Sequence, residues 1–101
     1  MNVKNLSVVS YETVYLIKPD VSEEQLFKII EHYQDMLMER GAKNIIVQNR
    51  GRRNLKYPIK KIKDSIYIQM NYDANGESVR LFEHSMKISE HVVRYLTVRC
   101  F

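Results

Sequence analysis

Two kinds of hydrophobic spacing alternate along the chain. Between Val8 and Lys18 every second residue is β-branched or aromatic, in the order Val9, Tyr11, Thr13, Tyr15, Ile17, which predicts a strand with one buried face. From about Glu23 to Arg40 the apolar residues recur at helical spacing instead. Leu26, Ile30, Tyr33 and Leu37, flanked by Phe27, Ile29 and Met36, predict the buried stripe of an amphipathic helix.

The ends of this helix carry recognisable signals. Pro19 and Asp20 stop the preceding strand, because proline cannot donate to a strand ladder. Ser22 is expected as the N-cap, with Gln25 completing a capping box, and Val21 and Leu26 are spaced for a hydrophobic staple. Gly41 is suited to the left-handed residue that ends many helices.

The second half predicts three more strands and one helix. Extended residues at 44–49 and again around Leu55, Tyr57 and Ile59 favour one long strand with a bulge or sharp twist at Gly51. A turn is expected at 63–65, a strand at 66–72 and a turn at 73–76. A helix at 77–87 places Val79, Phe82 and Met86 on one side, and the last strand is expected at 92–99.

This order, β-α-β-β-α-β, predicts an α+β fold, a ferredoxin-like βαββαβ sandwich in which two helices cover one face of a four-stranded antiparallel sheet. The chain is expected to be a single domain over residues 1–101, with a flexible N-terminus at 1–7. The other sheet face would meet solvent or a partner. Depending on register, tyrosines there can stack on bases or dock a protein, and each can equally pack in the core; the candidates are Tyr11, Tyr15, Tyr57, Tyr67, Tyr72 and Tyr95.

Charge is unevenly distributed along the 101 residues. The formal net charge is +4, but residues 43–63 hold eight basic side chains and no acidic one: Lys43, Arg50, Arg52, Arg53, Lys56, Lys60, Lys61 and Lys63. The remaining residues therefore carry a net charge of −4. Such a block indicates a polyanionic partner, either nucleic acid or an anionic membrane surface, or else a solvated face.

Size and composition argue against several classes of protein. A domain of 12.1 kDa has little core to spare for an enclosed active site. A single cysteine, Cys100, excludes an internal disulfide and favours a reducing compartment. Neither a targeting segment nor an apolar run of about 20 residues is visible, so the protein is expected to act where it is made.

No catalytic or metal-binding pattern stands out. His32, His84 and His91 share no ligand spacing, so neither a metal nor another cofactor is predicted. Leu16 to Asp20 resembles the first-strand signature of nucleoside diphosphate kinases, yet their catalytic histidine motif has no counterpart here. Acylphosphatases match in size, but Lys18 to Ser22 replaces their glycine-rich phosphate cradle. An enzyme of either type, with a small-molecule substrate, is the alternative interpretation.

A specific signature lies in Gly51-Arg52-Arg53-Asn54-Leu55-Lys56-Tyr57-Pro58-Ile59-Lys60. It resembles the pattern of the bacterial and plastid small-subunit ribosomal protein six family, as do Tyr11-Glu12-Thr13, the Pro19-Asp20 stop, Gly41 and residues 93–99. Lys56 departs from the pattern, because the family usually has Ala or Ser there. A longer C-terminal tail, which some members carry, is not expected after Arg99.

The resemblance implies a non-enzymatic role: binding to the central domain of small-subunit rRNA together with small-subunit ribosomal protein eighteen, without membrane or small-molecule partners. The RNA-binding candidates are Arg50, Arg52, Arg53, Lys56, Lys60 and Lys61, with Tyr11, Arg94 and Arg99 added from what are taken as neighbouring outer strands. Leu55 and Ile59 are expected in the core, and Tyr57 on either side. Plastid ribosomes are the predicted location, on composition and resemblance, with bacterial cytoplasm as the alternative.

Overall fold

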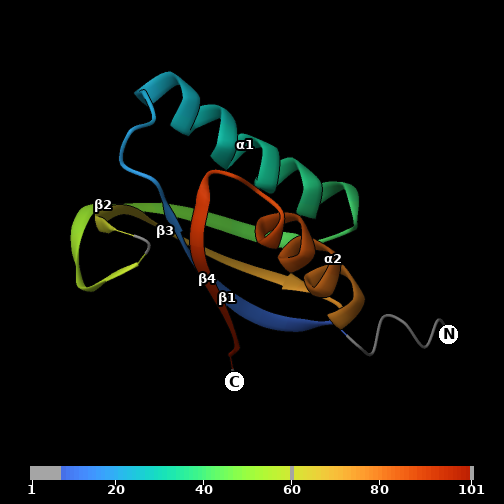
Figure 1. The fold of residues 1–101 in the computed structure, drawn as a ribbon. Coiled ribbons are helices and arrows are strands. Elements are labelled where there is room, and N and C mark those ends of the chain that lie inside the picture. Colours follow the sequence, from blue (N-terminus) through green and yellow to red (C-terminus); the bar gives the residue numbers. More distant parts are fainter. Residues whose placement is uncertain (1–7, 60, 101) are drawn as a thin grey trace, which may run out of the picture.

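The computed structural model describes residues 8–59 and 61–100. Its elements follow the order β1 (Val9–Ile17), α1 (Glu23–Glu39), β2 (Lys43–Ile59), β3 (Ile62–Ala74), α2 (Gly76–Lys87) and β4 (Val92–Arg99) (Figure 1). The predicted βαββαβ order is confirmed. The N-terminal segment 1–7, expected to be flexible, lies outside the described residues.

The four strands form one antiparallel sheet in the order β2-β3-β1-β4. Both helices lie over the same face of this sheet (Figure 1), as predicted. The expectation that β1 is an outer strand is wrong, because it pairs with β3 on one side and with β4 on the other. The first strand of this fold is inserted between two others, so only β2 and β4 are edges.

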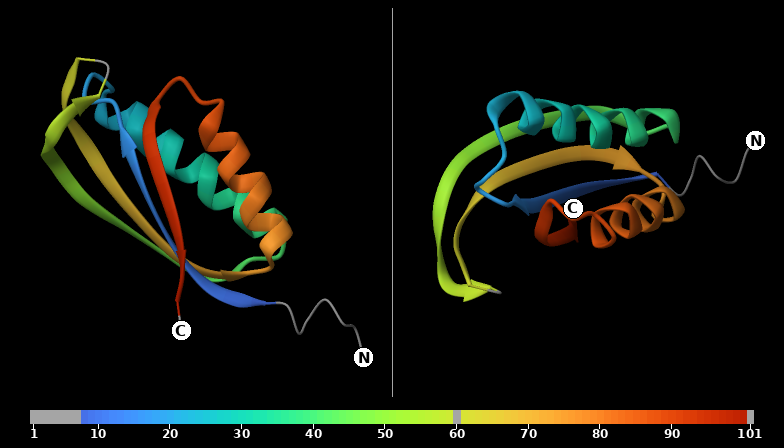
Figure 2. Two further views of the ribbon diagram at one scale, coloured as in Figure 1. Left: turned by 60° about the horizontal axis from the view of Figure 1, so that its bottom comes forward. Right: turned by 45° about the horizontal axis from the view of Figure 1, so that its top comes forward.

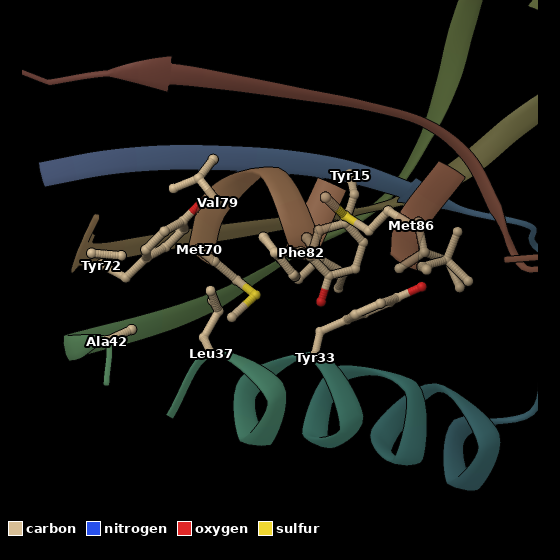
Figure 3. Close-up of a cluster of buried hydrophobic side chains, with 13 residues drawn as sticks. Tyr15, Tyr33, Leu37, Ala42, Met70, Tyr72, Val79, Phe82 and Met86 are labelled. Atoms are coloured by element: carbon tan, nitrogen blue, oxygen red, sulfur yellow. The ribbon is translucent and has the colours of Figure 1, made fainter. Parts of the chain in front are cut away.

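The core lies between the helices and the covered face of the sheet. Tyr33 and Leu37 of α1 and Phe82 of α2 meet sheet residues such as Tyr15 and Tyr72, and all five are at most 2% exposed (Figure 3). Their aromatic rings pack edge to face at centroid distances of 5.4 to 5.9 Å, an arrangement that adds to the burial of apolar area. The alternating pattern predicted for β1 is therefore the pattern of its buried face.

Of the six tyrosines considered for the outer face, four pack in or against the core and two do not. Those packed in or against the core are Tyr11, Tyr15, Tyr72 and Tyr95. Tyr67 is on the opposite face of β3, since it lies between the buried Ile66 and Ile68. Tyr57 is 76% exposed in β2. Of these six tyrosines, Tyr57 and Tyr67 are thus the two that do not pack in the core.

Ser22 is the N-cap of α1, as the sequence predicts, whereas one flank of the predicted helix stripe is wrong. The Ser22 hydroxyl accepts a hydrogen bond from the Gln25 amide at 3.1 Å, and Val21 and Leu26 both pack against the core. Phe27, predicted to flank the buried stripe, is 66% exposed. It lies on the solvent side of α1, because its neighbours Leu26 and Ile30 already fill the space above the sheet.

The hairpin of β2 and β3 is longer than predicted. β3 begins at Ile62, so the turn expected at residues 63–65 is wrong, and the strands reverse direction beside Lys61. The polar residues 63–65 are typical of a turn, yet Asp64 and Ser65 continue the pairing with β2. Leu55, expected in the core, is half-buried and outside the core cluster, because this hairpin extends beyond the reach of the helices; β2 curves strongly along its length (Figure 2).

Candidate nucleic-acid interface

The side of the sheet that the helices leave uncovered is here called the open face. Strand alternation and register place on it Glu12, Val14 and Leu16 of β1, Tyr67, Gln69, Asn71 and Asp73 of β3, and Arg94, Leu96 and Val98 of β4. Paired residues of neighbouring antiparallel strands project to the same side. The register therefore fixes which side chains of the signature segment can act together.

A bulge in β2 decides where its arginines point. The pairing shifts by one residue between Asn49, opposite Ile68, and Gly51, opposite Tyr67. Gly51 has a φ of +83°, and its amide donates to the Asn49 side-chain oxygen at 2.8 Å. Because one extra residue reverses the alternation of faces, Arg50 and Arg53 come to the open face although they are three residues apart.

Arg50 is tied into a polar network at the centre of the open face. Its Nε donates to Gln69 Oε1 at 3.2 Å. The Gln69 amide nitrogen donates in turn to Glu12 Oε1 at 2.8 Å and to Asn71 Oδ1 at 3.0 Å. Through Gln69, this network fixes the orientation of the Arg50 side chain and links β2, β3 and β1.

Arg53 lies over an aromatic ring of the neighbouring strand. Its guanidinium carbon is 5.6 Å from the centroid of the Tyr67 ring, within the range of a cation–π interaction. Its Nε donates to the Arg50 carbonyl oxygen at 3.4 Å. The two open-face arginines of β2 are therefore held next to each other.

Arg52, between them in sequence, points to the other side. Its Nη2 donates to the Pro19 carbonyl oxygen at 3.0 Å, and its Nη1 lies 3.8 Å from Asp64 Oδ2. It lines a hollow of about 440 Å³ with Leu26 and Ile30 of α1. Of the arginine candidates in β2, Arg52 is thus separated from the other two, and its charge is partly compensated.

The remaining basic candidates of the segment lie toward the end of the hairpin. Lys56 and Lys61 are exposed, as is Tyr57. Lys61 has a φ of +68°, typical of a tight reversal. Lys60 lies outside the described residues, and nothing is described of the side chain of Ile59.

The candidates from the terminal strands fall on different faces. Arg94 pairs with Leu16 and is exposed on the open face, beside the row that holds Tyr67. Arg99 pairs with Tyr11 on the helix side, where the Tyr11 ring stacks with Tyr72 at 6.0 Å. Arg94 can therefore join Arg50 and Arg53, whereas Tyr11 and Arg99 cannot share that surface.

The opposite end of the open face carries a carboxylate, that of Asp73, which is paired across the strands with Lys43 of β2. The Asp73 carboxylate accepts hydrogen bonds from the Ser10 hydroxyl at 2.6 Å and from the Asn44 amide at 2.7 Å. These bonds stabilise the charged form, so the pKa of Asp73 is lowered. Tyr67 and Asp73 are six residues apart on β3, about 20 Å along a strand. This carboxylate is therefore well separated from the arginines of the open face.

Among the described residues, no three His, Cys, Asp or Glu side chains gather as a metal site. None of the helices formed by the described residues has the length and apolar character to cross a membrane.

The RNA-binding candidates chosen from the sequence did not include Tyr67 or Gln69. Tyr67 was one of six tyrosines whose face depended on register, and Gln69 carries no charge that would have marked it. The signal was the alternation in Ile66-Tyr67-Ile68-Gln69-Met70, which places both residues opposite a buried apolar face. Only the pairing with β2 shows that this face is also the one that Arg50 and Arg53 reach.

Comparisons with known proteins agree on one family. Residues 10–99 match the model of the family described as Ribosomal protein S6. The chain is 62% identical over 88 residues to small ribosomal subunit protein bS6c of Guillardia theta, covering 87% of this chain and 92% of that protein. It is 49% identical over 89 residues to bS6 of Trichormus variabilis, covering 88% and 82% respectively. The crystal structure of 30S ribosomal protein S6 from Thermotoga maritima superimposes with a TM-score of 0.87 at 27% identity, covering 93% of this chain and 89% of that one.

Proposed function

The chain belongs to the ribosomal protein S6 family, whose members are structural components of the small ribosomal subunit, and from this premise we propose that it binds the central domain of small-subunit rRNA together with small-subunit ribosomal protein eighteen. It acts by binding and not by catalysis. The RNA contacts are made by the arginine end of the open face and by the adjoining hairpin.

The observation that supports this most directly is the convergence of Arg50, Arg53 and Arg94 on one uncovered face. Lys56 and Lys61 extend the positive surface onto the hairpin. Arginine and lysine contacts to phosphates supply affinity but little sequence information. Selection of the site must therefore come from RNA shape and from the partner protein.

A second part of the open face fits a protein partner. Leu96 and Val98 of the edge strand β4 are 64% and 43% exposed. They follow Arg94 along the same face of β4, and the strands β1 and β3 separate them from Arg50 and Arg53 of β2. Exposed apolar side chains grouped in this way are typical of protein interfaces. Bound together, the two proteins add their RNA contacts, so the pair binds where this chain alone is weak.

Salt dependence tests the RNA assignment. If about four basic side chains neutralise phosphates, log affinity for the rRNA domain in the presence of protein eighteen should fall against log salt with a slope near −3, at roughly 0.7 to 0.9 per contact. Arg53→Gln should reduce the magnitude of the slope by about one contact. Arg52→Gln is the matched control, because Arg52 faces away and pairs with Asp64, and it should leave the slope unchanged. A slope near zero for the wild type would refute the assignment.

A pull-down tests the partner assignment. The full chain should retain both rRNA and protein eighteen, and Leu96→Lys should reduce retention of the protein while leaving the chain's own RNA contacts intact. Retention of rRNA alone, from an extract that contains protein eighteen, would contradict a paired mode of binding.

We propose that the ribosome containing this protein lies in the plastid stroma, with a bacterial cytoplasm as the alternative. The support is the 62% identity to a plastid-type relative, set against 49% for a bacterial one. An antibody raised against the chain should detect it in ribosomes pelleted from purified plastids. Its absence from that pellet would favour the bacterial alternative.

A further inference from the structure

A guanidinium and an aromatic ring lie next to each other at the arginine end of the open face. The guanidinium of Arg53 lies over the ring of Tyr67, 5.6 Å from its centroid. The Arg50 carbonyl oxygen accepts a hydrogen bond from Arg53 Nε at 3.4 Å. An arginine side chain normally samples many rotamers, so a ring below and an acceptor beside it hold this one in a defined orientation.

The β2 residue beside this pair has no side chain. Tyr67 pairs with Gly51 in β2, and apart from the neighbours Arg50 and Arg52 no described residue has an atom within 4 Å of the position that a Cβ would take there. On the β1 side, Tyr67 pairs with Leu16, which is only 7% exposed. A side chain at position 51 therefore does not separate the pair from a ligand.

The charge of this pair is not compensated within the described part of the chain. Among those residues no carboxylate lies within ion-pair distance of Arg53, whereas Arg52 has Asp64 at 3.8 Å. Arg50 and Arg94 stand on the same face on either side of the Tyr67 row. A ligand that is both flat and negatively charged would match the ring and the arginines of this surface.

We propose that the Arg53–Tyr67 pair stacks an unpaired nucleotide of the rRNA, with the base on the guanidinium plane and the flanking phosphates at Arg50 and Arg94. The inference rests on the proposed function, because it takes RNA as the ligand. Bases stack favourably on arginine and aromatic planes, but only when they are free of a duplex. The surface would therefore distinguish looped or bulged RNA from continuous helix, which the phosphate contacts alone do not.

Two substitutions separate stacking from simple charge. Arg53→Lys keeps the positive charge and removes the plane, and Tyr67→Leu keeps apolar bulk and removes the ring. Arg52→Lys is the matched control, since it makes the same chemical change one residue away on the opposite face. Tyr67→Phe keeps the ring and should behave as the wild type, which guards against a loss of folding being read as a loss of stacking.

The measurement uses the full chain with two RNA probes of equal length, a single strand and a duplex, each carrying a fluorescent adenine analogue whose emission is quenched on stacking. Arg53→Lys and Tyr67→Leu should lower affinity for the single strand by about fivefold or more, from the usual contribution of one stacked base. They should also abolish the quenching. Affinity for the duplex should change by less than about twofold, because the charge is retained.

The inference is overturned if both probes lose affinity equally, if quenching persists in Arg53→Lys and Tyr67→Leu, or if these variants lose only protein eighteen. Capture of rRNA with protein eighteen is measured in parallel. If the wild type captures rRNA while the substitutions leave single-strand binding unchanged, the stacking inference is refuted and the proposed function is retained. If the wild type captures neither rRNA nor either probe, the proposed function itself is refuted.

Discussion

Replacing Gly51 by alanine isolates the energetic cost of the bulge in β2. Apart from the neighbours Arg50 and Arg52, no residue in the described part of the chain has an atom within 4 Å of the added Cβ, so the substitution causes no clash with the rest of the fold. The backbone at this position has a φ of +83°, in a region that side-chain-bearing residues adopt at a cost of about 1 to 2 kcal/mol. Gly51→Ala should therefore lower the free energy of unfolding by about that amount, a substantial part of the 5 to 15 kcal/mol typical of a small domain.

Two further replacements of glycine, Gly51→Asn and Gly76→Ala, serve as controls. Gly51→Asn should cost less, because asparagine tolerates the left-handed region, as Asn44 of this chain does at a φ of 55°. Gly76→Ala changes the first residue of α2, where the nearest atom to the new Cβ is the Tyr11 hydroxyl at 3.8 Å. That is an ordinary contact, and since alanine favours helix, Gly76→Ala should leave stability unchanged or raise it by up to about 0.5 kcal/mol.

Urea unfolding of the three variants at constant m-value gives the comparison, and thermal unfolding should show a drop of about 4 to 8 °C for each kcal/mol lost. The reasoning is refuted if Gly51→Ala is as stable as the wild type, since the left-handed backbone would then cost nothing. It is equally refuted if Gly76→Ala destabilises as much as Gly51→Ala, because the effect would then be one of side-chain volume.

Three further predictions concern the core and the limits of pH stability. Phe82→Ala should lower the free energy of unfolding by about 3 to 5 kcal/mol, measured by urea unfolding, since the ring is fully buried; a loss below about 1 kcal/mol would contradict the packing. Hydrogen bonds from Ser10 and Asn44 lower the pKa of Asp73, so their stabilisation is present above the unfolded-state pKa and is lost as pH falls through the folded value. Asp73→Asn should flatten the acid limb of stability against pH, and an unchanged limb would count against these bonds. Burial raises the pKa of Tyr72 to about 12, so stability should fall as pH rises above about 10, where the unfolded phenol ionises, and Tyr72→Phe should weaken that alkaline loss.

The order of elements was predictable because each carries its own local signal. The strand at 92–99 appears with the bounds expected from its composition, and Ser22 caps α1 as its side-chain chemistry requires. The failures occur where local signals compete with pairing. Residues 63–65 have turn chemistry, but pairing with β2 carries β3 through them, and no local pattern reports a partner strand.

The site was predictable in composition but not in arrangement. The basic block and its signature segment were visible as charge, and Arg50 and Arg53 were among the candidates. Their separation from Arg52 depends on a register shift, and the part played by Tyr67 depends on which strand lies beside β3. Both are properties of strand pairing, which brings together residues far apart in sequence.

The bulge links these observations, because it explains why the arginines at positions 50 and 53 lie on the same face of the sheet. In a regular strand, alternation would place Arg50 and Arg52 on one face and Arg53 on the other. The extra residue before Gly51 reverses the alternation, so Arg53 returns to the face of Arg50 and Arg52 moves to the Pro19 carbonyl and Asp64. The same glycine places no side chain opposite Tyr67. The residue that accepts the left-handed backbone is therefore also the one at which the arginines separate onto two faces. A side chain at Gly51 should affect RNA binding even where the fold accommodates it.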